Sequence, residues 1–166
     1  MGELWLQVLP AGERELARLA QDYNLKQAEK AIVVNQQRLR SDPDDPKAHL
    51  QMGRALLSLG KGGEAQPYFQ TAVARQPDSD EPHYFLGLTL RMQRQLVAAR
   101  REFETALRLN PNSYKAHGNL GMIFIEQGDF ILAEEHFLAA LRLNPEDQIA
   151  RSGLAALSKA TGALKR

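Results

Sequence analysis

The chain has 166 residues, 43% of them hydrophobic and 25% charged, which is the composition of an ordinary globular domain. Its formal net charge is only +1, so no global electrostatic field favours nucleic acid or an anionic membrane as a partner. The sequence contains no cysteine, which excludes disulfides, thiolate nucleophiles and cysteine-ligated zinc.

Residues 1–12 form an apolar N-terminal segment that contains Leu4, Trp5, Leu6, Val8 and Leu9. The segment is shorter than the roughly 20 residues that a membrane-spanning helix needs, so no membrane insertion is expected. It also lacks the basic start of a secretory signal, which favours a cytoplasmic protein or a soluble domain excised from a larger one. These side chains predict a contact with the molecule's own groove or with a second copy, as a homodimer.

Residues 13–45 predict a degenerate helical pair that caps the amino end of the fold. Its inward positions are expected to be Leu16, Leu19, Ala28, Ala31, Ile32 and Leu39, which recur at helical spacing. Ala31 and Pro43 keep the register of the repeat described next, but Asn35 and Arg38 stand where that repeat has phenylalanine and alanine.

From Pro46 onward the sequence repeats at an interval of 34 residues, which defines units at 46–79, 80–113 and 114–147. Each unit has a histidine, a glycine, an alanine, a phenylalanine and a proline at matching positions. These are His49, Gly53, Ala65, Phe69 and Pro77, then His83, Gly87, Ala99, Phe103 and Pro111, then His117, Gly121, Ala133, Phe137 and Pro145.

The spacing within a unit predicts two helices that pack on each other. Positions 49, 52, 53 and 56 share one helical face, as do positions 65, 69 and 72. A glycine inside a helix costs about 1 kcal/mol relative to alanine, which indicates close approach of the partner helix. The large phenylalanine ring then covers the apolar face that one unit cannot bury alone.

This pattern resembles the tetratricopeptide repeat family, whose unit carries W-x2-L-G-x2-Y, then A-x3-F, then P. Histidine replaces the usual tryptophan, and Arg94 stands where Gly60 and Gly128 supply the turn glycine. The resemblance implies an all-α fold, a right-handed superhelix (α-solenoid) of antiparallel helix-turn-helix repeats. Residues 148–166 are then a C-terminal capping helix, ending near Gly162, and a tail.

No residue set predicts catalysis, a cofactor or a metal ion, so the chain is not expected to be an enzyme. His49, His83 and His117 belong to successive units about 10 Å apart, which is too far for one ion. His136 is expected on a solvated face rather than as a base. The run from Gly60 to Gly63 lacks the spacing of a phosphate loop. The basic tract from Arg91 to Arg108 is interleaved with glutamates and lacks aromatic platforms for bases.

In the family that the chain resembles, the first helix of each hairpin lines a concave groove that binds a partner. The resemblance implies binding of an apolar peptide or helix of another protein by Lys47, Leu50, Arg54, Leu57, Ser58, Glu81, Tyr84, Leu88, Arg91, Met92, Lys115, Gly118, Met122, Ile125 and Glu126. Seven of these residues are apolar at positions where the side chain would be exposed to solvent if no partner were bound, which is typical of an interaction site. A curved solenoid also buries part of this face between neighbouring first helices.

Two further expectations concern the partner. The family's clamp for chaperone tails is poorly matched, since of its positions only Lys115 agrees, so tight binding of such a tail is not predicted. The alternative function is a structural self-assembly unit, either through the N-terminal segment or by end-to-end stacking.

Overall fold

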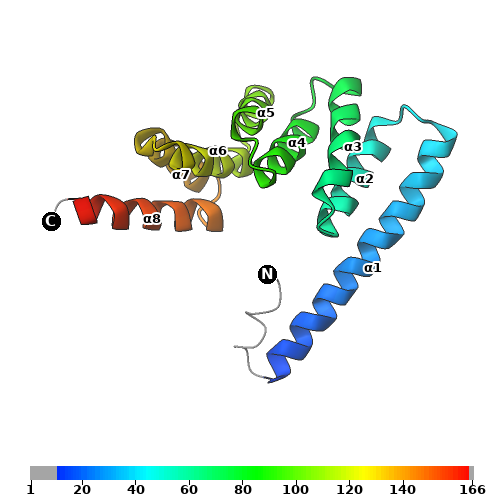
Figure 1. Ribbon diagram of the computed structural model, residues 1–166, viewed down its shortest axis with the longest axis horizontal. Coiled ribbons are helices and arrows are strands. Elements are labelled where there is room, and N and C mark those ends of the chain that lie inside the picture. The colour runs from blue at the N-terminus through cyan, green and yellow to red at the C-terminus, as the bar shows by residue number, and fades with distance from the viewer. Residues whose placement is uncertain (1–10, 165–166) are drawn as a thin grey trace.

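The computed structural model describes residues 11–164. This part of the chain forms eight helices and no strand: α1 (Ala11–Ser41), α2 (Pro46–Ser58), α3 (Gly62–Arg75), α4 (Asp80–Met92), α5 (Leu96–Leu109), α6 (Tyr114–Gln127), α7 (Phe130–Leu143) and α8 (Gln148–Leu164). Helices α2 and α3, α4 and α5, and α6 and α7 are the three predicted hairpins. They stack into a curved superhelix with α1 at one end and α8 at the other (Figure 1).

Caps and tight turns set the helix bounds. The Asp45 carboxylate accepts hydrogen bonds from the backbone N–H groups of Lys47 and Ala48, and Pro46 follows as the first helical residue of α2. The turns inside the first and third hairpins place Gly60 and Gly128 at φ values of 73° and 81°. Arg94 adopts the same left-handed conformation, with φ 64°, in the second hairpin. The missing glycine therefore leaves the turn geometry unchanged, at the cost of a strained arginine backbone.

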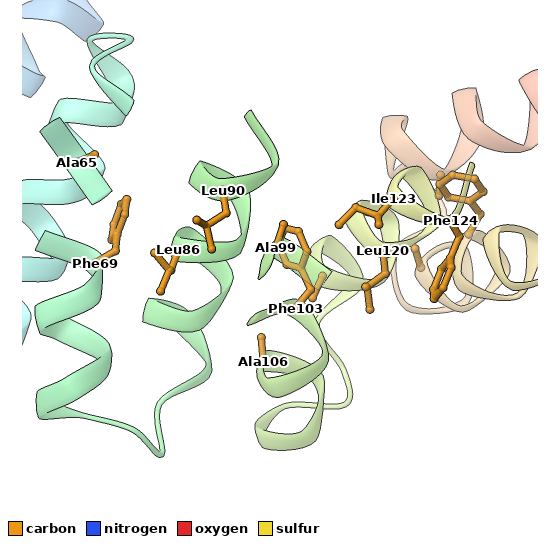
Figure 2. Packing of buried hydrophobic residues seen from close by; sticks show 14 of the residues in the cluster. Ala65, Phe69, Leu86, Leu90, Ala99, Phe103, Ala106, Leu120, Ile123 and Phe124 are labelled. Carbon is orange, nitrogen blue, oxygen red and sulfur yellow. The ribbon is translucent and has the colours of Figure 1, made fainter. Parts of the chain in front are cut away.

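The core is built from the repeated phenylalanines. Phe69, Phe103 and Phe137 are fully buried. Figure 2 shows Phe69 facing Leu86 of the next hairpin and Phe103 lying toward Leu120. The predicted close approach is confirmed, because a Cβ atom at Gly53 would lie 2.6 Å from the Phe69 ring.

The amino end differs from the predicted helical pair, because residues 11–41 form the single helix α1. Residues 13–40 contain no glycine or proline, so nothing in this stretch ends the first helix. Ala28 and Asn35 are buried on the side of α1 that packs on α2. Asn35 stands where the repeats have phenylalanine, and its buried side-chain amide donates a hydrogen bond to the Ala31 carbonyl. Leu19 is exposed, contrary to the prediction.

The carboxyl end is a single helix, as predicted, although α8 continues through Gly162 to Leu164. Ala150 and Leu157 are buried against the preceding helices. Asp147 precedes the helix, and its carboxylate accepts a hydrogen bond from the Ala150 N–H over 3.0 Å. The apolar segment at residues 1–10 lies outside the described residues.

Candidate functional site: the inner wall

The curvature of the stack gives the first helices one continuous surface. Helix α2 contacts α4, α4 contacts α6 and α6 contacts α8, whereas α3, α5 and α7 do not contact one another. Helices that touch lie on the shorter, concave side of a curved stack, so the first helices line the concave side. We call this surface of α2, α4 and α6 the inner wall; the fifteen predicted contact positions all lie on these three helices.

The apolar positions of the inner wall are more deeply packed than the sequence indicated. Met92 is 56% exposed, but Leu57, Tyr84, Leu88, Met122 and Ile125 are partly buried against the core. Neighbouring first helices cover part of each side chain and leave the rest open. The wall is therefore a shallow apolar strip rather than a fully exposed patch.

Two predicted contact residues are not accessible. Leu50 is only 6% exposed and belongs to the core cluster, so its prediction as a groove residue is wrong. Gly118 is also buried, since a Cβ atom there would lie 3.0 Å from the Asp147 carboxylate. Gly118 faces Asp147 and Ile149 at the start of α8, a contact between neighbouring units that a single repeat does not display.

Three of the six charged residues of the inner wall form ion pairs within the described part of the chain. Arg54 on α2 pairs with Glu81 on α4 at 2.9 Å, and its guanidinium lies 5.1 Å from the centre of the Phe85 ring. Glu126 on α6 pairs with Arg94 at 2.6 Å. Lys47 and Lys115 are exposed. The two carboxylates of the wall are thus already neutralised by arginines.

Tyr84, Arg91 and Asn119 lie close together where α4 meets α6. Burial raises the pKa of the Tyr84 hydroxyl, while the positive charge of Arg91 and the amide of Asn119 lower it to a lesser extent. Asn119 is fully buried, and its amide nitrogen donates to the Lys115 carbonyl. The Asn119 Oδ1 and the Arg91 Nε are buried without any hydrogen-bond partner. The wall thus has a polar centre within its apolar strip.

A hollow of about 540 Å³ extends the inner wall onto α1. It adjoins Arg54 and Ser58, and its other lining residues are Asn24, Gln27, Ala28, Ala31, Gln51 and Ala55. Sequence reasoning missed the residues of α1 because it divided this stretch into two capping helices. Its unbroken helical periodicity was the available signal.

The family assignment rests on the repeats themselves. The family profile described as tetratricopeptide repeat matches residues 50–114, 93–148 and 119–165. The chain belongs to the tetratricopeptide repeat family. No curated protein sequence matches it significantly.

Solved structures of other tetratricopeptide proteins have the same fold. MamA superposes with a TM-score of 0.73 at 21% identity, covering 93% of this chain and 86% of that one. MamA from Desulfovibrio magneticus RS-1, from residue 41 to its end, has a TM-score of 0.66 at 27% identity and covers 76% and 71%. YrrB, described as a TPR protein with an unusual peptide-binding site, has a TM-score of 0.70 at 20% identity and covers 87% and 71%.

The repeated histidines of this tetratricopeptide chain join one repeat to the next. His49 Nε2 lies 2.8 Å from the Pro43 carbonyl oxygen, and His83 Nε2 lies 3.1 Å from that of Pro77. His49 thereby contacts the turn that follows α1, and His83 contacts the proline that ends the first repeat. This packing role agrees with the structural interpretation of these positions.

His136 differs from the prediction of a solvated face. Its Nδ1 lies 3.0 Å from His117 Nδ1, and its ring stacks on Phe124 with centroids 5.3 Å apart. Burial, followed by the charge of His117, lowers the pKa of His136 to about 4. Burial also lowers the pKa of His117. Both rings are therefore neutral near pH 7, and they lie on the side away from the inner wall.

The described residues provide neither a metal-binding cluster nor a membrane-spanning helix. No group of three or more His, Cys, Asp or Glu side chains there could hold a metal ion. None of the helices in residues 11–164 is long and apolar enough to cross a membrane.

Proposed function

We propose that this tetratricopeptide chain is a non-catalytic interaction scaffold that holds a peptide or helix of another protein against its inner wall. The observation that carries the proposal is the apolar strip running across α4 and α6. Leu88 and Met92 contribute to it from α4, and Met122 and Ile125 from α6. All four are left partly or largely open by the fold.

The guest expected on this strip is predominantly apolar. Two neighbouring helices with partly open aliphatic and thioether side chains remove apolar surface of a guest from water, at about 25 cal/mol per Å² buried. Methionine adapts its shape to different guests because its unbranched side chain has three rotatable bonds. The description of YrrB as a peptide-binding protein of this fold supports the proposal.

Selection from a phage-displayed library of random 12-residue peptides tests the proposal. Peptides enriched on the wild-type protein should be rich in apolar residues, and their binding should fall at least tenfold in the Met92→Asp variant. Val97→Asp is the matched control, because Val97 is 65% exposed on the second helix α5. Enrichment of no peptide, or equal loss in both variants, would contradict the proposal.

A second candidate function is self-assembly, which the exposed side of α1 favours. Leu19, Tyr23, Val33 and Val34 are all more than half exposed, and helical spacing places them away from the side of α1 that packs on α2. Such a face is typical of a helix that pairs with another helix. Light scattering across concentration tests it: growth that Val34→Asp abolishes supports assembly, and a constant monomer mass excludes it.

A further inference from the structure

The polar centre of the inner wall has hydrogen-bonding capacity that the fold leaves unused. Arg91 Nε is a donor and Asn119 Oδ1 an acceptor, and both atoms are buried without a partner. A buried polar atom without a hydrogen bond costs about 1–3 kcal/mol, so native proteins leave few of them. Neither atom is accessible to a guest, but their place beside Tyr84 marks Arg91, which is itself partly exposed, as the polar group of the wall that lacks partners.

The charges of the inner wall indicate which group this is. Its fifteen positions include four cations, Lys47, Arg54, Arg91 and Lys115, against the two carboxylates of Glu81 and Glu126. The carboxylates are paired with Arg54 and Arg94. The neighbouring acid, Asp147, is mostly buried and caps α8 through the Ala150 N–H. Arg91 forms none of the ion pairs in the described part of the chain.

We infer that the guest carries an acidic side chain whose carboxylate binds Arg91 between the apolar residues of α4 and α6. A guanidinium presents parallel N–H donors that match both oxygens of a carboxylate, so one acidic residue would bind the terminal nitrogens of the partly exposed Arg91.

The apolar surroundings make this pairing selective. Leu88 and Met92 on α4 and Met122 and Ile125 on α6 exclude water around the ion pair once a guest covers them. An acid in such a setting strengthens binding only when the cation is present, and otherwise adds a desolvation cost. The guest is therefore an apolar segment with one acidic residue at a fixed position, rather than an acidic tail.

This inference rests on the proposed function and is tested within the same peptide selection. Peptides selected on the wild-type protein should share one Asp or Glu at a constant place among apolar residues. Changing that residue to Gln in the peptide should weaken binding about tenfold or more, the usual contribution of a charge-assisted hydrogen bond. In the Arg91→Gln variant, the Glu and Gln forms of the peptide should bind equally.

A control and a charge reversal separate the outcomes. Arg101→Gln removes an exposed arginine from α5 and should leave the peptide preference unchanged. Arg91→Glu should prefer a Lys form of the same peptide, which a merely unfolded variant would not do. Apolar peptides without a shared acid, or an acid preference that persists in Arg91→Gln, would overturn the inference while leaving the scaffold function intact. The absence of any selected peptide would overturn both.

Discussion

Gly121 on α6 and Phe137 on α7 touch so closely that a Cβ atom at Gly121 would lie 2.5 Å from the Phe137 ring. Gly53 and Phe69 have the same relationship in the first repeat, where the corresponding distance is 2.6 Å. The phenylalanine thus occupies the space that a side chain on the first helix would need. This contact sets the distance between the two helices of a hairpin.

Gly121→Ala should therefore lower the free energy of unfolding by about 1–3 kcal/mol, because the added methyl group overpacks a filled core. Urea denaturation followed by circular dichroism measures this change. Gly63→Ala is the matched control, since a Cβ atom at Gly63 in α3 meets no atom within 4 Å. Alanine is the better helix former, so this control should be neutral or stabilise by up to about 1 kcal/mol. Equal destabilisation in both variants would contradict the packing argument.

Arg94→Gly should raise the free energy of unfolding by roughly 0.5–1 kcal/mol. The left-handed conformation costs an L-residue about 1–2 kcal/mol, and glycine escapes that cost. The ion pair of Arg94 with Glu126 is lost, but Arg94 is largely exposed and such pairs contribute about 0–1 kcal/mol. Gly128→Ala, the opposite change at the equivalent turn, should destabilise by about 1 kcal/mol. A shift of the thermal midpoint in the same direction for both would refute this account.

Stability should fall as the pH drops from about 6.5 toward 4. The folded state holds His136 and His117 with lowered pKa values, so the unfolded state binds more protons in this range. The stabilisation is complete above the unfolded pKa and is lost as the pH approaches the folded pKa of about 4. In His136→Gln this part of the pH dependence should shrink. Unfolding curves from pH 4 to 8 measure it, and an unchanged slope in the variant would exclude the histidine pair as the cause.

Asp45→Ala should destabilise the chain by about 1 kcal/mol, the usual cost of losing a helix cap. Asp45 accepts hydrogen bonds from two backbone N–H groups at the start of α2, and its pKa is lowered chiefly by the bond from Ala48. Ser79 stands before α4 at the same place but makes no cap hydrogen bond, so Ser79→Ala should have little effect. Thermal unfolding measures the stability of the two variants. Equal losses of stability would show that the cap hydrogen bonds of Asp45 do not contribute.

The pairing of helices could be predicted from the sequence because it depends on contacts inside one repeat. A glycine at one position and a phenylalanine 16 residues later specify a close hairpin wherever they recur, as Gly53 and Phe69 show. Such contacts are short-range, so the pattern that encodes them is read directly along the chain. The same reasoning failed in α1, where Asn35 replaces the phenylalanine and no turn residue separates two helices.

The inner wall was predicted less completely, because the exposure of its side chains depends on how successive repeats tilt toward one another. The register of the 34-residue repeat predicted that Leu50 and Arg91 both lie on the groove face of their helices. The structure buries Leu50 in the core and leaves a donor of Arg91 without a partner. No spacing within a single repeat distinguishes these two outcomes, since both arise from the neighbouring first helix.

The sequence by itself determined the helical hairpins, their interval and the family, because each repeat encodes its own packing through residues a few turns apart. Only the tertiary structure decided which wall residues remain open, which charges are already paired and how far α1 extends. Those features follow from the curvature of the stack, which sums small rotations between repeats and brings together residues about 30 positions apart, such as Arg54 and Glu81.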